Sequence, residues 1–193
     1  GQHTSSITAT WLGAMLLSNK EAMADCLAEQ RARARGHAEG AQLTHQPRVS
    51  SLRARCRPQA RVPDEASLTY ANLLEMDCMR RAITETLRLY PPLILLMRQV
   101  MKDGFKVGEH TIPKGDVVGL CAPASNLDPR YWSDPLRFDP GRYLPGADAK
   151  DMFDSRSVGH GAMQGFMLSF GGGAHMCSGR RFGYLQVSTI WSI

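Results

Sequence analysis

Apolar residues are concentrated near the start of the chain. The stretch 8–17 predicts a mostly buried helix that continues from Gly1. Ser18, with Glu21 three positions later, matches a capping box and predicts a second helix that runs toward Gln30. The chain is therefore expected to open with two consecutive helices.

Two further helices are predicted before a pair of prolines. Ser67 or Thr69 can cap a short helix that runs through Glu75. A longer helix begins at Asp77, and Pro91-Pro92 must end it because proline has no N–H to donate and disfavours a helical predecessor. Its apolar or small positions are Met79, Ala82, Ile83, Thr86, Leu87 and Tyr90.

Beyond the prolines the pattern changes to short strands, which are expected at residues 93–100, 105–107, 110–112 and 116–122. A long irregular segment from 123 to about 165 is dense in Pro, Gly and Asp. Aromatic rings are expected to anchor it, at Tyr131, Trp132, Phe138, Tyr143 and Phe153. Helical spacing returns over 178–193. The expected fold is mainly α with small β-sheets.

Length and composition fit one globular domain. The chain has 193 residues, of which 43% are apolar, and this is enough for a single core. Its longest apolar stretches fall short of the ~18 residues that cross a bilayer. The five cysteines are widely spaced and none forms Cys-x-x-Cys, which argues against a zinc ribbon, a thioredoxin-type centre or a disulfide scaffold. A reducing compartment is the expectation.

The net charge of +5 is concentrated in residues 31–61, which carry eight arginines against one acid, Glu39. Like-charged blocks of this kind are typical of solvated, disordered loops, and we expect a basic insertion here. A nucleic-acid arm is the alternative, but no aromatic residues are interleaved for base stacking, so no nucleic-acid partner is expected. A mis-assembled gene segment and a lineage-specific insertion both remain open as its origin.

The sharpest chemical signal is the string from Phe170 to Gly179, immediately before the last helix. A cysteine at the N-terminus of a helix, here Cys177, is expected to meet the positive end of the helix dipole and several backbone N–H groups. Both favour the thiolate over the thiol. Three glycines ahead of it let the backbone approach a large flat partner closely. His175 adds a donor beside the sulfur. The alternative is an ordinary buried cysteine with a structural role only.

This string resembles the haem-binding loop of the cytochrome P450 family, Phe-x-x-Gly-x-(Arg/His)-x-Cys-x-Gly. Its specified positions are met by Phe170, Gly173, His175, Cys177 and Gly179. Three more signatures of the family occur in this chain, in the same order as in the family. They are the oxygen-binding groove at residues 1–6, Glu85-Thr-Leu-Arg88, and Phe138-Asp-Pro-Gly-Arg142.

Within the family, Gln2-His3-Thr4-Ser5-Ser6 and the histidine two residues before the cysteine resemble the sterol 14α-demethylase branch. The resemblance covers roughly residues 1–30 and 65–193. It implies a partial cytochrome P450 fold, from the I helix to the L helix, as the C-terminal part of a haem domain.

The resemblance also implies roles for individual residues. Cys177 would be the axial thiolate on the iron of haem b, and Thr4 with His3 would deliver protons to bound O₂. Arg98 and His175 match positions that contact the haem propionates. The alternative for Thr4 is a structural role, in which its hydroxyl donates to a carbonyl of the preceding helical turn.

Two further groups are structural or substrate-facing. Glu85 and Arg88 stand three residues apart on one helical face, and with Arg142 they would form a buried ionic cluster without a catalytic role. A solvated pair is the alternative. Alternate residues of the first strand lie on one face. That face, with Leu93, Leu95 and Met97, lines the pocket above the haem in the resembling branch, and ordinary core is the equally weighted alternative.

Four positions depart from the usual loop pattern and leave haem affinity and redox tuning open, namely Ala174, Met176, Ser178 and Arg180. The expected function is a monooxygenase that inserts one atom of O₂ into a C–H bond of a 14α-methyl sterol. NADPH–cytochrome P450 reductase would supply the electrons. Another lipid or terpenoid substrate is the first alternative, and an inactive basic fragment is the second.

The resemblance further implies an N-terminal membrane anchor that precedes Gly1 and places the full-length protein on the cytoplasmic face of the endoplasmic reticulum membrane. The 193 residues alone are then expected not to make a working enzyme, because one wall of the haem pocket would face water.

Overall fold

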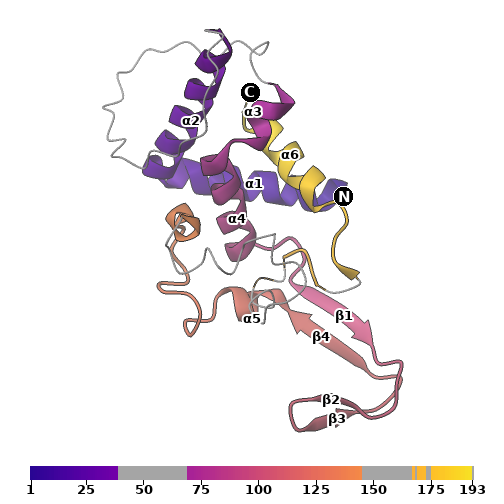
Figure 1. The fold of residues 1–193 in the computed structure, drawn as a ribbon. Coiled ribbons are helices and arrows are strands. Elements are labelled where there is room, and N and C mark those ends of the chain that lie inside the picture. The colour runs from indigo at the N-terminus through magenta and orange to yellow at the C-terminus, as the bar shows by residue number, and fades with distance from the viewer. Residues whose placement is uncertain (39–68, 145–166, 168, 173–174, 193) are drawn as a thin grey trace.

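The computed structural model describes residues 1–38, 69–144, 167, 169–172 and 175–192 (Figure 1). Its helices are α1 (Gln2–Ser18), α2 (Lys20–Ala38), α3 (Tyr70–Leu74), α4 (Asp77–Leu89), α5 (Ala122–Asn126), the 3₁₀ turn η2 (Pro140–Tyr143) and α6 (Arg180–Ile190). Its strands are β1 (Leu95–Gln99), β2 (Phe105–Val107), β3 (His110–Ile112) and β4 (Val117–Cys121).

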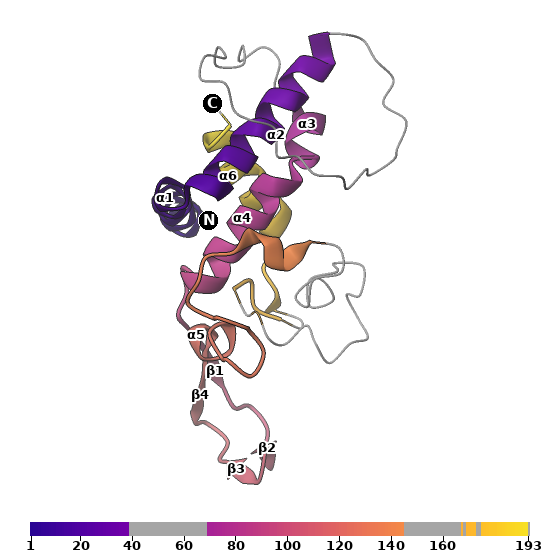
Figure 2. The ribbon, with the colours of Figure 1, turned by 90° about the vertical axis from the view of Figure 1, so that its left-hand side faces the viewer.

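The core lies where α1, α2, α4 and α6 meet, with α4 in contact with the other three (Figures 1 and 2). Its buried apolar residues are Ala9, Leu12, Leu16, Cys26, Met76, Met79, Ala82, Ile83, Leu87, Phe138 and Val187. Among the described residues, no helix is both long and apolar enough to cross a bilayer.

Helix α4 is held at both ends. The side chain of its N-cap residue, Met76, makes no capping hydrogen bond, and Glu29 of α2 accepts from the backbone N–H groups of Cys78 and Met79 at 3.0 and 3.1 Å instead. This carboxylate satisfies donors that a helix start leaves unpaired and meets the positive end of the dipole. The helix ends at Leu89 and is followed directly by Tyr90 and the two prolines.

Two antiparallel strand pairs extend away from the helices (Figure 1). Strand β1 pairs with β4, with Leu96 opposite Leu120 and Arg98 opposite Val118. Strand β2 pairs with β3. Because β1 follows α4 after a few residues, its first half stays near the helical core.

The expected fold class is confirmed, together with α1, α3 capped by Thr69, α4, the four strands and α6. Three expectations differ. Ser18 belongs to α1 and does not cap α2, because Asn19 alone separates the two helices and its carbonyl accepts from Met23 N–H. Helix α5 interrupts the segment expected to be irregular, since Pro123 is tolerated in a first helical turn.

The third difference concerns the basic segment, 31–61. Helix α2 does not end near Gln30 but continues to Ala38, because alanine and arginine are both good helix formers. Arg33 pairs with Glu75 beside α3, which anchors this extension. Residues 39–61 lie outside the described residues, as does Phe153.

Candidate active site

A cavity of about 400 Å³ lies between the start of α1, the middle of α4, the start of β1 and the loop that leads into α6. It brings together seven of the residues singled out in the sequence. These are Thr4, Leu93, Arg98, Phe170, His175, Cys177 and Gly179. Gly173 lies outside the described residues.

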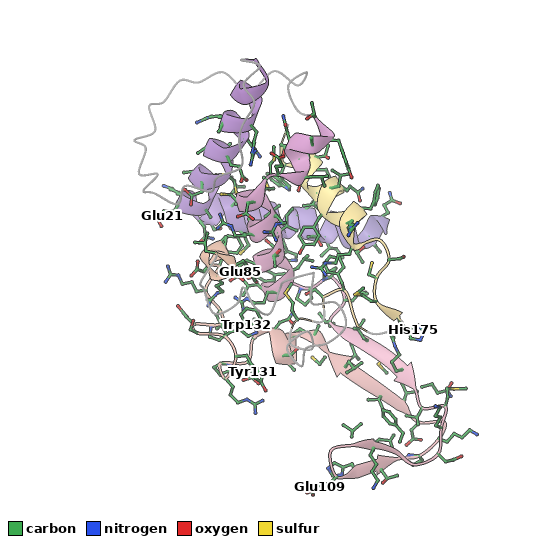
Figure 3. The ribbon with its side chains drawn as sticks, viewed as in Figure 1. Glu21, Glu85, Glu109, Tyr131, Trp132 and His175 are labelled. Carbon is green, nitrogen blue, oxygen red and sulfur yellow. The ribbon has the colours of Figure 1, made fainter. Side chains whose placement is uncertain are left out.

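The loop around Cys177 is closed by its own backbone. Cys177 N–H donates to the Phe170 carbonyl at 2.9 Å, so the chain folds back on itself across the glycines. Gly171 has φ of +68°, in the left-handed region that glycine adopts without penalty. The Cys177 side chain is exposed, and Gly179 is the N-cap of α6. His175 sits at the outer edge of the same loop (Figure 3).

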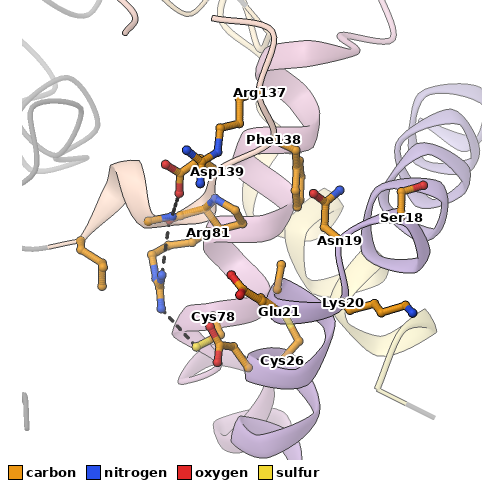
Figure 4. A pocket seen from close by; sticks show the side chains of 15 residues that line it. Ser18, Asn19, Lys20, Glu21, Cys26, Cys78, Arg81, Arg137, Phe138 and Asp139 are labelled. Atoms are coloured by element: carbon orange, nitrogen blue, oxygen red, sulfur yellow. Dashed lines mark hydrogen bonds between the residues drawn. The ribbon is translucent and has the colours of Figure 1, made fainter. Parts of the chain in front are cut away.

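The other described cysteines have different surroundings. Cys26 and Cys78 line a second cavity of about 540 Å³ between α2, α4 and η2 (Figure 4). Burial raises the pKa of Cys26 to about 12 and that of Cys78 to about 11, so both remain thiols at neutral pH. Cys121 is exposed and lies off the 400 Å³ cavity, although it directly precedes α5. A helix start therefore does not distinguish Cys177 from Cys121, and the cavity does.

We expect Cys26 and Cys78 to resist alkylation in the folded protein. At pH 8 their raised pKa values leave about 100- to 1000-fold less thiolate than an unperturbed cysteine carries. Iodoacetamide labelling followed by peptide mass spectrometry measures this, with urea-unfolded protein as the control. Equal rates in folded and unfolded protein would contradict the burial of these thiols.

Thr4 and His3 are separated by the structure. Thr4 lines the cavity, and its Oγ1 donates to the Gly1 carbonyl at 3.0 Å, the back-bonded arrangement of a helical threonine. His3 is exposed and is not among the residues that line the cavity. A rotation of 100° per residue brings Thr4 and Thr8 to the same side of α1, and Ser5 lies at the edge of that side.

The first strand presents a different face from the expected one. Leu93 lines the cavity from the segment before β1, but within the strand the lining residues are Leu96 and Arg98. Leu95 and Met97 lie on the opposite face, where both come close to Gly119 of β4. The alternation was expected to run from Leu93, whereas the regular strand begins only at Leu95.

The expected ionic cluster is present, and its Glu85–Arg88 pair is fully buried. Arg88 donates through Nε and Nη2 to the two carboxylate oxygens of Glu85, each at 2.8 Å, and both residues have 0% of their surface exposed. Arg142 Nε donates to Glu85 at 3.1 Å. Figure 3 places Glu85 at the centre of the molecule, close to Trp132.

This cluster ties α4 to the segment that follows α5. Arg88 donates to the carbonyls of Asn126 and Pro135 at 2.9 and 2.7 Å, and its guanidinium lies 4.9 Å from the centre of the Trp132 ring. The buried charge of Arg88 is tolerated because its guanidinium donates both to the carboxylate of Glu85 and to backbone carbonyls. The arrangement orders backbone and offers no open position for a reactant.

Sequence reasoning named Tyr143 only as an anchoring ring and not as part of the ionic cluster, and it missed Ser169 and Tyr184 at the cavity. Tyr143 donates to Glu85 at 2.9 Å, and burial together with that carboxylate raises its pKa well above the usual value. Ser169, on the cavity wall, donates to the Leu87 carbonyl at 2.8 Å. Tyr184 also lines the cavity and shares a 2.9 Å hydrogen bond with Thr84. Only Tyr143 carried a sequence signal, as a ring directly after Arg142.

The sequence matches the family model for cytochrome P450 over residues 1–192. Over its whole length the chain is 35% identical to obtusifoliol 14-alpha demethylase of Sorghum bicolor, 36% to sterol 14-demethylase of Arabidopsis thaliana and 31% to lanosterol 14-alpha demethylase of Mus musculus. It covers 32%, 33% and 30% of those proteins, so it spans about a third of the length of the curated relatives. The chain belongs to the cytochrome P450 family.

Proposed function

We propose that this chain carries the haem-thiolate centre of a sterol 14α-demethylase. The observation that supports it most is the 400 Å³ cavity, where Cys177, His175, Arg98 and Thr4 come together from separate parts of the chain. The relatives that match the whole chain are demethylases of 14α-methyl sterols by name, which supports the substrate class.

The residues at the cavity fit a haem. Haem needs an apolar wall, a ligand for iron and cations for its two carboxylates. Leu96 and Phe170 contribute to the wall, and the exposed Cys177 lines the same cavity together with His175 and Arg98. We assign the axial ligand to Cys177 and the carboxylate contacts to Arg98 and His175. Phe170 and Gly179 shape the loop on either side of the sulfur.

When bound, haem with a thiolate ligand supplies the activation of O₂ and the insertion of one oxygen atom into a C–H bond. The chain's own residues hold and deliver protons. Thr4 Oγ1 donates its hydrogen bond to the Gly1 carbonyl at 3.0 Å, and we propose that rotation of the hydroxyl turns this donor into the cavity. Arg98 donates one hydrogen bond from its guanidinium group to the Met97 carbonyl, and the remaining N–H groups can donate to a haem carboxylate.

The proposed partners follow from the chemistry. A monooxygenase of this kind needs two electrons for each oxygen atom inserted, and we propose NADPH–cytochrome P450 reductase as their source. We propose the cytoplasmic face of the endoplasmic reticulum membrane as the location of the full-length protein. His3 is proposed as a proton relay at the solvent side of Thr4, since it is exposed beside the cavity residue.

Substrate class is tested by product analysis of the full-length, haem-loaded protein with reductase and NADPH. Lanosterol and obtusifoliol are the probes, and each should be converted to its 14-demethylated product. The matched control is the same sterol without its 14α-methyl group, which should consume no NADPH above background. Turnover of an unrelated terpenoid, with both sterols left unchanged, would favour the alternative substrate class.

Thr4→Ala should reduce the amount of product formed for each NADPH consumed. Loss of a positioned proton donor typically costs 10²–10⁴-fold in rate, and we expect the lower end, about 100-fold, because water can enter the space. Thr10→Ala is the matched control. Thr10 lies on the same helix and makes the same back-bond, to the Ser6 carbonyl at 2.9 Å, but does not line the cavity. Equal losses in both variants would count against a proton role.

A further inference from the structure

Trp191, directly after α6, presses its indole ring onto the backbone of α1. A Cβ added to Gly13 would overlap the ring atoms Cζ2 and Cη2, so only glycine permits this approach. The indole Nε1–H donates to the Ala9 carbonyl at 3.0 Å. The carbonyl of Trp191 itself accepts from Gln30 Nε2 at 2.8 Å. One residue thus fixes the C-terminal end of α6 on both α1 and α2.

The same two helices form facing walls of the cavity. Helix α1 contributes Thr4 and Thr8, and α6 contributes Gly183 and Val187 just after the Cys177 loop. The two helices are in contact with each other. Any change in their separation therefore moves the Thr4 hydroxyl relative to the loop that holds Cys177.

We propose that Gly13 and Trp191 are positioning residues that set the spacing between α1 and α6, and with it the placement of Thr4 opposite Cys177. This inference rests on the proposed function, because it concerns the reaction at that cavity. Packed interiors transmit such a shift instead of absorbing it. A displacement of about 1 Å at a reacting group can cost 10²-fold in rate.

Gly13→Ala separates this role from simple helix stability. Alanine is the better helix former, so α1 alone would gain stability, whereas the overlap with the indole must force the two helices apart or turn the ring. Trp191→Phe keeps a ring but removes the fused part and the Nε1–H donor. In Gly13→Ala/Trp191→Phe the shorter ring leaves room for the new methyl group.

The test uses the full-length, haem-loaded protein and two optical probes that need no turnover, imidazole and the bulkier 4-phenylimidazole. In Gly13→Ala we expect the ratio of their dissociation constants to change by about tenfold, which is the lower limit that one methylene can produce in an apolar pocket. Product per NADPH should fall by up to about 100-fold. Trp191→Phe alone should move both readouts in the same sense by about threefold, and the double variant should recover most of the loss.

Leu17→Ala is the control on the same helix, since Leu17 is 70% exposed and does not line the cavity. The inference is overturned if Gly13→Ala keeps both the wild-type ratio of the two dissociation constants and the wild-type amount of product per NADPH. It is also overturned if the double variant is no better than Gly13→Ala. If Gly13→Ala does not load haem, unchanged readouts in Trp191→Phe overturn it. A wild-type protein that shows no thiolate-ligated haem would instead refute the proposed function.

Discussion

Arg88→Ala should abolish the folded holoprotein and not merely slow its turnover. The substitution leaves the buried carboxylate of Glu85 without its two shortest charged contacts, and it removes the donors to the carbonyls of Asn126 and Pro135. Removal of one partner of a buried ion pair costs ~3–5 kcal/mol, and each unpaired carbonyl adds ~1–3 kcal/mol. Domains have only ~5–15 kcal/mol to lose.

The measurement is the yield of soluble, haem-loaded protein, together with urea unfolding of whatever is recovered. Arg80→Ala is the matched control, because Arg80 lies on the same helix and pairs with Asp77, but both side chains are about half exposed. That pair should contribute ~0–1 kcal/mol, and the control should keep wild-type yield. A stable, haem-loaded but slow Arg88→Ala protein would argue that Arg88 takes part in catalysis directly.

Local patterns were sufficient to predict α4 and its ion pair. The spacing of Glu85 and Arg88 places them on one face, and two prolines end the helix whatever packs around it. The end of α2 was not predictable in the same way. A run of arginine and alanine suits a solvated loop and a helix equally, and the contact of Arg33 with Glu75 comes from a segment distant in sequence.

Residues that belong to a sequence motif, such as Cys177, do line the cavity, whereas the sequence did not predict positions that depend on strand phase or on helix packing. Leu95 and Met97 lie away from the cavity because Leu93 precedes the regular strand, so the direction of its side chain does not set which face of β1 meets the cavity. The contact of Trp191 with Gly13 joins opposite ends of the chain, and no local periodicity reveals it. Such contacts depend on how complete helices approach each other.

Cys177→Ser should remove the thiolate character of the bound haem altogether. A serine hydroxyl stays protonated at neutral pH and supplies no sulfur ligand to the iron, whereas Cys177 lines the cavity just before α6. Cys121→Ser is the matched control. Cys121 is also exposed and also precedes a helix, yet it lies off the cavity, so its loss should leave the haem unchanged.

The most direct test of the account is the optical spectrum of the ferrous carbon monoxide complex of the full-length protein, recorded for wild type, Cys177→Ser and Cys121→Ser. We expect the absorption band that is diagnostic of thiolate ligation in wild type and in Cys121→Ser, and its complete absence in Cys177→Ser. A thiolate band that persists in Cys177→Ser and disappears in Cys121→Ser would contradict the assignment of the haem ligand.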